Sequence, residues 1–223
     1  MRRRHASPCS FARDIEILAP TLLEYWAIRC TLPSARVHWA GVNLGRWQGM
    51  HQTSSVIVCG LAGALTTDLA SGTVLIPDKV SLVNGKEMRC DPLLVQILIS
   101  AARTLHMPLK TGPLLTTPSL TVGKARLYWA QQGFVAVDME TGLLLEQNPR
   151  AATIRVILDS PKHDLSSSWL WPGNALRQPQ IWKQLFWLSW IAPRYAFQAA
   201  RVVKTGIGSD PASVSLDFTK EKK

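Results

Sequence analysis

Two acidic residues, Glu140 and Asp159, stand at the ends of hydrophobic segments that are typical of buried strands. Glu140 comes shortly after Phe134–Val137, and Asp159 directly follows Ala152–Leu158. A carboxyl group in such a setting loses part of its hydration, and this favours a pKa that suits proton transfer. Taken singly, each acid is more simply explained as a helix cap or a first-turn acid, which is common at this point of an α/β fold.

Two further features of the sequence could contribute to a site: an arginine close to Asp159, and a glycine-containing segment that follows another apolar run. Arg155 precedes Asp159 by four residues, a spacing that puts both side chains on one face of a strand and predicts an ion pair. Gly60–Gly63 follows the β-branched segment Ser55–Cys59 and predicts a loop whose N–H groups cradle an anion, or a plain tight turn. This segment has neither the dinucleotide-binding glycine pattern nor a phosphate-loop lysine, so ATP and dinucleotide sites are disfavoured.

The elements that must position these residues alternate between short apolar runs and helices. The clearest helix is expected over Asp91–His106, and a long tryptophan-rich helix over Gln178–Val203. Such alternation predicts an α/β fold, with a largely parallel sheet between two layers of helices. Ligands of these sheets collect at the carboxyl ends of the strands, where Glu24, Gly60–Gly63, Glu140 and Asp159 are expected.

Composition places the chain among globular proteins. It has 223 residues, 47% of them hydrophobic and 18% charged, with a mean hydropathy of +0.05. We expect one domain over residues 14–204, a basic flexible tail at 1–13 and a flexible tail at 205–223. The start of the chain lacks the apolar core of a secretory signal, and no apolar run is long enough to cross a bilayer. The cysteines are widely spaced and predict free thiols in a reducing cytoplasm, and no histidine has the spacing of a metal ligand.

The formal net charge of +10 raises the question of a nucleic-acid partner. Residues 1–13 carry four arginines and no acid, and residues 204–223 carry four lysines against three acids. Half of the positive excess therefore lies at the two ends, and the rest is scattered along the chain. This distribution disfavours nucleic acid and favours a weakly basic surface that attracts anionic substrates or anionic lipid.

Four segments taken in order carry a resemblance to a known family. VIVCGLAGAL, GTVLIPDKV, FVAVDMET and IRVILDS resemble the nucleoside phosphorylase and nucleosidase superfamily, with V-D-M-E and R-x-x-x-D as the most specific part. The likeness covers about residues 15–205. It implies a three-layer α/β/α sandwich with a mixed, largely parallel sheet, and an enzyme that cleaves the N-glycosidic bond of a purine-type nucleoside.

The resemblance implies a role for each matching residue. Glu140 would accept hydrogen bonds from the ribose hydroxyls, and Met139 would pack against the sugar. Asp159 would give a proton to the purine N7 or share one with it, which lowers the barrier because the base leaves as an anion. Glu24 occupies the position of a water-activating glutamate in the family's nucleosidases.

The other expected site residues lie on the nucleophile and base sides. Gly60 and Gly63 would face phosphate, or the water that replaces it, and Arg46 is a candidate anion ligand by position. Ser119 and Leu120 fall in the base-recognition stretch. No cofactor is expected, and inorganic phosphate is the one conceivable co-substrate.

The sequence departs from the family pattern at several points: no acid near Ser119 and Leu120 defines the base, and Gly41–Gly45 is looser than the usual glycine loop. Leu61 stands where many members have serine or threonine, and the loss of this hydroxyl weakens the case for phosphate. The sequence therefore leaves hydrolysis and phosphorolysis both open. The alternative is a catalytically impaired relative that serves as a nucleoside- or lipid-binding scaffold.

The tryptophan-rich helix has three interpretations. Trp182, Phe186 and Trp190 recur every fourth residue and form one aromatic face, which would pack on the core, form a subunit interface or meet a lipid surface. The segments APTLLEYWAIR and LLTTPSL resemble the branch with the hopanoid-associated phosphorylases, which implies an adenosyl-lipid substrate. We therefore expect a cytoplasmic homo-oligomer that acts on a nucleoside-type molecule and contacts the inner membrane peripherally.

Overall fold

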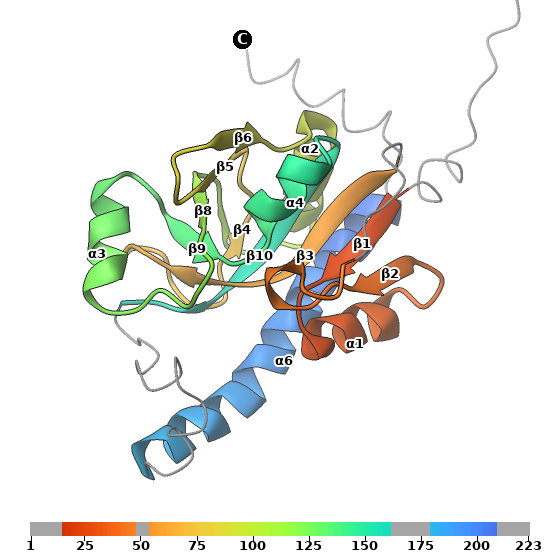
Figure 1. Cartoon of the computed structure of the whole chain (residues 1–223). Coiled ribbons are helices and arrows are strands. Elements are labelled where there is room, and N and C mark those ends of the chain that lie inside the picture. The colour runs from red at the N-terminus through yellow and green to blue at the C-terminus, as the bar shows by residue number, and fades with distance from the viewer. Residues whose placement is uncertain (1–14, 48–53, 162–178, 209–223) are drawn as a thin grey trace, which may run out of the picture.

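The computed structural model describes residues 15–47, 54–161 and 179–208 of the chain. Figure 1 shows a strongly twisted sheet with helices around it. The tail expected at 1–13 lies outside the described residues, as does 209–223. The last helix continues past the expected domain boundary at residue 204 as far as Gly208.

The sheet has ten strands in the order β6-β5-β8-β9-β3-β10-β4-β7, and β1 joins it by pairing with β3 and β2. Most neighbouring strands are parallel, and the pairs β10–β4, β3–β9 and β5–β6 are antiparallel. The mixed, largely parallel sheet is therefore confirmed. The strands are β1 (Ile15–Ala19), β2 (Arg36–Trp39), β3 (Ser55–Ala64), β4 (Val74–Leu75), β5 (Lys79–Leu82), β6 (Glu87–Arg89), β7 (Leu109–Lys110), β8 (Leu114–Thr116), β9 (Ala136–Asp138) and β10 (Ala151–Asp159).

Strands β1, β3 and β10 form the middle of the core. Nearly all their side chains are buried, which explains why their sequences are mostly apolar on both faces and do not alternate regularly with polar residues. Apolar side chains from both faces of this part of the sheet belong to one large hydrophobic cluster. The residues at the ends of these strands are consequently held by the buried core of the fold.

Helices cover both faces of the sheet, as expected for an α/β/α sandwich. Helix α6 packs on α1, α2, β3 and β10, whereas α4 packs on β5, β8 and β10. The helices are α1 (Leu22–Thr31), α2 (Pro92–Thr104), α3 (Lys124–Gln131), α4 (Thr141–Gln147) and α6 (Pro179–Gly208), with a short 3₁₀ turn, η2, at Val42–Leu44. None of the helices in the described residues is both long and apolar enough to cross a bilayer.

Two sequence expectations about local structure can be checked directly. Asp91 does cap α2, because its Oδ1 accepts hydrogen bonds from the N–H groups of Leu93 at 2.9 Å and Leu94 at 3.1 Å. Three of the four cysteines lie in the described residues and all three are free thiols.

Candidate active site

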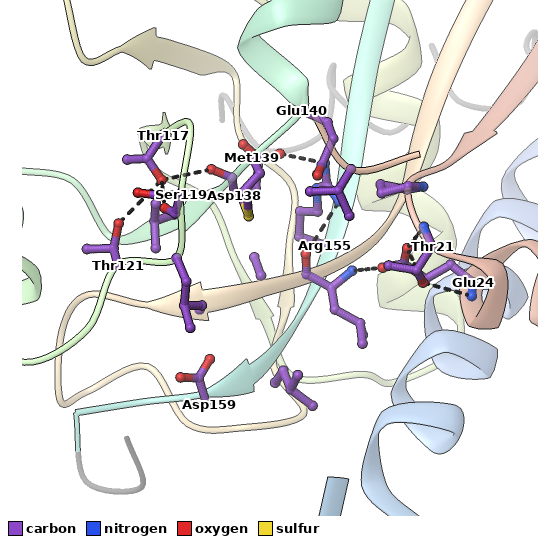
Figure 2. A pocket seen from close by; sticks show the side chains of 18 of the residues that line it. Thr21, Glu24, Thr117, Ser119, Thr121, Asp138, Met139, Glu140, Arg155 and Asp159 are labelled. Atoms are coloured by element: carbon purple, nitrogen blue, oxygen red, sulfur yellow. Dashed lines mark hydrogen bonds and ion pairs between the residues drawn. The ribbon is translucent and has the colours of Figure 1, made fainter. Parts of the chain in front are cut away.

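A cavity of about 280 Å³ opens where strand β3 changes its neighbour. On one edge, Ser55–Val58 pair with β1, and Gly63–Ala64 pair with β9. The stretch between them, residues 59–62, has no strand partner on that edge, so the sheet parts there. Figure 2 shows the side chains that converge on the gap. The lining residues are Pro20, Thr21, Glu24, Val42, Leu61, Ala62, Gly63, Thr117, Ser119, Leu120, Thr121, Arg126, Val137, Asp138, Met139, Glu140, Arg155, Leu158 and Asp159.

Glu24 supplies the hydrogen bonds that a neighbouring strand would otherwise give to β3. Its Oε1 accepts the N–H of Leu61 at 2.7 Å, in the middle of the unpaired stretch. Its Oε2 accepts the N–H and the hydroxyl of Thr21 at 2.7 and 2.8 Å, and Thr21 caps α1 in return. A carboxylate oxygen has about two acceptor sites, so Oε1 keeps one that can accept a hydrogen bond from a water.

Gly60 and Gly63 belong to β3, and the prediction of a glycine loop at this place was wrong. The glycines are needed because side chains cross the strand closely. A Cβ on Gly60 would lie 2.5 Å from Oε1 of Glu24 and 2.8 Å from Nη1 of Arg155, and one on Gly63 would lie 3.1 Å from Oδ1 of Asp159. Glycine in a strand interior often marks such a close approach.

Arg155 is fully buried and binds the acids of the V-D-M-E segment. Its Nη2 donates to Oδ2 of Asp138 at 2.5 Å and to Oε2 of Glu140 at 3.3 Å. The expected ion pair between Arg155 and Asp159 is not formed. The register of β10 against β3 shifts between Ile157 and Asp159, and this irregularity breaks the alternation of faces on which the expectation rested.

Asp138 is a site residue that the sequence reasoning missed. In addition to Arg155, its Oδ2 accepts the N–H of Thr141 at 3.1 Å, and its Oδ1 accepts the hydroxyl of Thr116 at 2.5 Å. Its side chain is fully buried. Asp138 therefore holds Arg155 in place and fixes the start of α4, next to Met139 and Glu140.

Glu140 is buried and has an unusual protonation equilibrium. Burial raises the pKa of Glu140 to about 7; the charge of Arg155 lowers it, those of Asp138 and Glu24 raise it, and a 3.4 Å hydrogen bond from the Asn43 N–H lowers it. For Arg155, burial lowers the pKa, but the surrounding carboxylates outweigh burial and the net shift is upward. The guanidinium is thus a permanent charge beside a carboxyl group that can gain or lose a proton near neutral pH.

Asp159 is paired with Arg126 of α3, a second residue that the sequence reasoning missed. Nη2 of Arg126 donates to Oδ2 of Asp159, while Nη1 donates to the Ala64 carbonyl at 2.7 Å and Nε to the Thr121 carbonyl at 3.0 Å. Both side chains are almost completely buried. The ion pair could not be predicted from sequence spacing, because Arg126 and Asp159 lie on different elements. Arg126 ties the acid at the end of β10 to β3 and to the loop before α3.

That loop supplies the remaining expected residues. Ser119 and Leu120 line the cavity between β8 and α3, and Met139 lines it from the β9–α4 junction. The hydroxyl of Thr117 donates to the Ser119 carbonyl at 2.8 Å, and Nδ2 of Asn43 donates to the carbonyl of Pro118 at 2.9 Å. The loop is therefore anchored both to itself and to the η2 turn.

The structure thus brings together Glu24, Gly63, Met139, Glu140 and Asp159, with Ser119 and Leu120 beside them. Gly60 lies behind the lining and gives room to the side chains that cross it. Arg46 does not line the cavity: its guanidinium carbon lies 4.0 Å from the ring centroid of Trp39. Among the described residues, no group of three or more histidine, cysteine or acidic side chains is arranged to hold a metal ion.

Comparison with known families agrees with this arrangement. The sequence profile of the phosphorylase superfamily matches residues 45–168, more than half of the chain. The chain belongs to the phosphorylase superfamily. The matched range contains β3, the V-D-M-E segment and the acid at the end of β10, and three of the four segments that carried the sequence resemblance contribute residues to the cavity lining; the GTVLIPDKV segment contributes none. The hopanoid branch of the family is not identified by this match.

Solved structures show the same fold at low sequence identity. Futalosine hydrolase of Helicobacter pylori aligns with a TM-score of 0.64 and 14% identity over 88% of this chain and 97% of its own. The 5′-methylthioadenosine/S-adenosylhomocysteine nucleosidase of H. pylori aligns with a TM-score of 0.64 and 15% identity over 88% and 98%. The corresponding nucleosidase of Campylobacter jejuni gives 0.62 and 14% over 94% and 99%. No curated protein sequence matches the chain.

Proposed function

We propose that this protein hydrolyses the N-glycosidic bond of a purine-type nucleoside. The observation that carries the proposal is the meeting of three acids, Glu24, Glu140 and Asp159, in one cavity at the parted edge of β3. Each comes from a different element, and each has a different set of bonds. Cleavage of a glycosidic bond needs a group that holds the sugar, one that protonates the leaving base and one that prepares the nucleophile.

The bonds of each acid assign these tasks. Glu140 lies beside Met139, and its ionised carboxylate accepts hydrogen bonds from the ribose hydroxyls. Oδ2 of Asp159 accepts a hydrogen bond from Arg126, which orients the carboxyl group that carries the proton for the base or shares it. Glu24 holds a water at the acceptor site of Oε1 that Leu61 leaves open. Protonation of the base lowers the barrier because the departing purine would otherwise carry a full negative charge.

The charges around the cavity favour water over phosphate as the second substrate. Four acids line it, Glu24, Asp138, Glu140 and Asp159, and the guanidinium groups of its two lining arginines already bind acids. The Leu61 N–H, which an anion would otherwise use, is bonded to Glu24. A phosphate dianion prefers free N–H groups and unpaired cations, so phosphorolysis is the less favoured alternative.

The decisive experiment measures release of free base. The protein is incubated with adenosine, 5′-methylthioadenosine or inosine, with and without phosphate, and base and sugar products are separated by chromatography. We expect base and free ribose without phosphate, and a loss of at least about 100-fold for Asp159→Asn. Asp68→Asn is the matched control, because that acid is exposed on the surface and lies outside the cavity.

Other results of this experiment would favour a different reaction, a non-catalytic role or a different catalytic acid. Product formation only with phosphate would replace hydrolysis by phosphorolysis. Binding of nucleosides in a thermal-shift assay without release of base would favour the non-catalytic scaffold, for which Leu61 is the motivating departure. Equal turnover of wild type and Asp159→Asn would remove Asp159 from the role of acid.

A finer proposal concerns the 5′ end of the substrate. The resemblance to the hopanoid-associated branch favours an adenosyl-lipid, and apolar side chains in the lining are compatible with a hydrophobic 5′ substituent. Val42 both lines the cavity and is 48% exposed, so the cavity reaches the surface beside η2. We expect a higher kcat/KM for 5′-alkyl adenosines than for adenosine. An equal or lower kcat/KM would confine the substrate to small nucleosides.

A further inference from the structure

Helix α6 carries one continuous exposed stripe of aromatic and basic side chains. The exposed fractions are 78% for Phe186, 75% for Trp190 and 42% for Phe197. Exposed basic residues continue the same line at helical spacing of three or four residues. In order, the stripe is Phe186, Trp190, Arg194, Phe197, Arg201 and Lys204.

Within the described residues, the first part of this helix does not pack on the sheet or on the other helices. Of the described side chains between Gln184 and Ile191, none is buried, whereas Ala192, Ala196 and Ala199 are buried against the body of the protein. Figure 1 shows the amino-terminal part of α6 extending well beyond the sheet and the other helices. Large aromatic side chains this exposed are costly in water and mark a surface that meets a partner.

The charge of the helix limits the kind of partner. The thirty residues of α6 include four basic residues, Lys183, Arg194, Arg201 and Lys204, and no acid. A second copy of the chain that docked α6 on α6 about a two-fold axis would bring basic groups against basic groups. An anionic surface meets no such repulsion, and each basic group near it adds to binding.

We propose that the exposed stripe of α6 binds the surface of a membrane that contains anionic phospholipid. Aromatic rings of this kind settle at the level of the headgroups, and arginine and lysine pair with the lipid phosphates. The helix would lie on the membrane, because it is not apolar enough to cross one. This inference rests on α6 alone and is independent of the chemistry proposed for the cavity.

The experiment is co-sedimentation of the full chain with vesicles of phosphatidylcholine, with and without phosphatidylglycerol. We expect binding to the anionic vesicles only. Arg194→Gln with Arg201→Gln should lower the partition coefficient about 30-fold, which corresponds to about 1 kcal/mol for each basic side chain. Phe186→Ala with Trp190→Ala should lower it at least about 10-fold, because the anchoring aromatic area is lost.

Matched controls separate the stripe from net charge and general hydrophobicity. Arg89→Gln with Arg103→Gln removes the same charge from exposed positions on β6 and α2, and should leave binding unchanged. Leu127→Ala with Tyr128→Ala removes side chains on α3 that are 57% and 54% exposed, and should also leave it unchanged. Because all these positions are exposed, circular dichroism and thermal melting should match wild type.

Several results would overturn the proposal. Absence of wild-type binding to anionic vesicles would do so, as would equal binding by the stripe variants. A change of oligomeric state in the aromatic variant, measured by light scattering, would assign the stripe to a second copy. Binding of single-stranded nucleic acid in place of vesicles would assign it to that partner.

Discussion

Replacing Arg126 by methionine tests the buried ion pair with Asp159 most directly. Methionine keeps most of the apolar volume but removes the charge and the donors. The variant removes the guanidinium that binds the buried carboxylate of Asp159, and it also leaves the carbonyls of Ala64 and Thr121 without the donors that they had at 2.7 and 3.0 Å. Breaking one side of a buried pair costs about 3–5 kcal/mol. We therefore expect a loss of this size in the free energy of unfolding.

The assay is urea denaturation of a double-mutant cycle. Arg126→Met, Asp159→Asn and the double variant are compared with wild type at neutral pH. We expect the double variant to be more stable than the sum of the single losses predicts, by about 1–3 kcal/mol, because the second change removes the buried charge that Arg126 no longer neutralises. Arg29→Met is the control: its Nη1 also donates to a carbonyl, that of Ala35 at 3.3 Å, but the side chain is only partly buried. It should cost less than about 1 kcal/mol.

The same cycle can be measured in kcat/KM. If Arg126 acts by holding Asp159, its loss lowers the rate in the wild-type background and has little further effect when Asp159 is already asparagine. The reasoning is refuted if the free energy of unfolding of Arg126→Met lies within about 1 kcal/mol of the wild-type value. This bound is twice the usual effect of a surface substitution, which is about 0.5 kcal/mol. Additive losses of stability in the cycle would refute it equally.

Three other predictions follow from the site. Gly60→Ala should cost about 1–3 kcal/mol and abolish turnover, because the new Cβ would meet side-chain atoms at 2.5 and 2.8 Å, whereas Gly208→Ala has open space and should be neutral in thermal melts. Because the pKa of Glu140 is raised from 4.5 to about 7, its protonated form stabilises the fold below pH 4.5, and this contribution is lost as the pH rises through 7. Glu140→Gln should remove that decline, on the order of 3 kcal/mol in urea titrations across this range, and a decline that persists would contradict the assignment. Burial strongly raises the pKa of Cys59, so iodoacetamide should modify exposed Cys30 in the native protein and Cys59 only after unfolding; native labelling of Cys59 would count against the packing.

The positions of the buried strands along the chain could be predicted from the sequence because their segments are mostly apolar, whereas the order of the strands in the sheet was not predicted. The acids at the strand ends could be found for the same reason, since a carboxyl group after such a run is conspicuous. The partners of these acids could not be predicted. Arg155 was expected to meet Asp159 from its spacing, but a local register shift in β10 reverses the geometry. The true partner, Arg126, is 33 residues away on a helix, and only the tertiary fold brings the two together.

The glycines of β3 show a second limit of sequence reasoning. A glycine pair after a β-branched run predicts a turn, because the usual reason for glycine is backbone freedom. Here the reason is the space taken by Glu24, Arg155 and Asp159, which lie on other elements. Arg46 illustrates the converse: a position near the site along the chain does not place a side chain in the cavity.

The three contacts made by the Glu24 side chain limit which substitutions this position tolerates. The same carboxylate caps α1, satisfies the Leu61 N–H in the gap of the sheet and faces the cavity. A substitution of Glu24 also weakens the capping box of α1 and leaves the Leu61 N–H without its acceptor. A lineage that altered the reaction here would have to replace both structural functions in the same step. Change of activity is therefore more accessible at the loop around Ser119 and Leu120, which line the cavity and take no part in the capping box of α1 or in the hydrogen bond to Leu61.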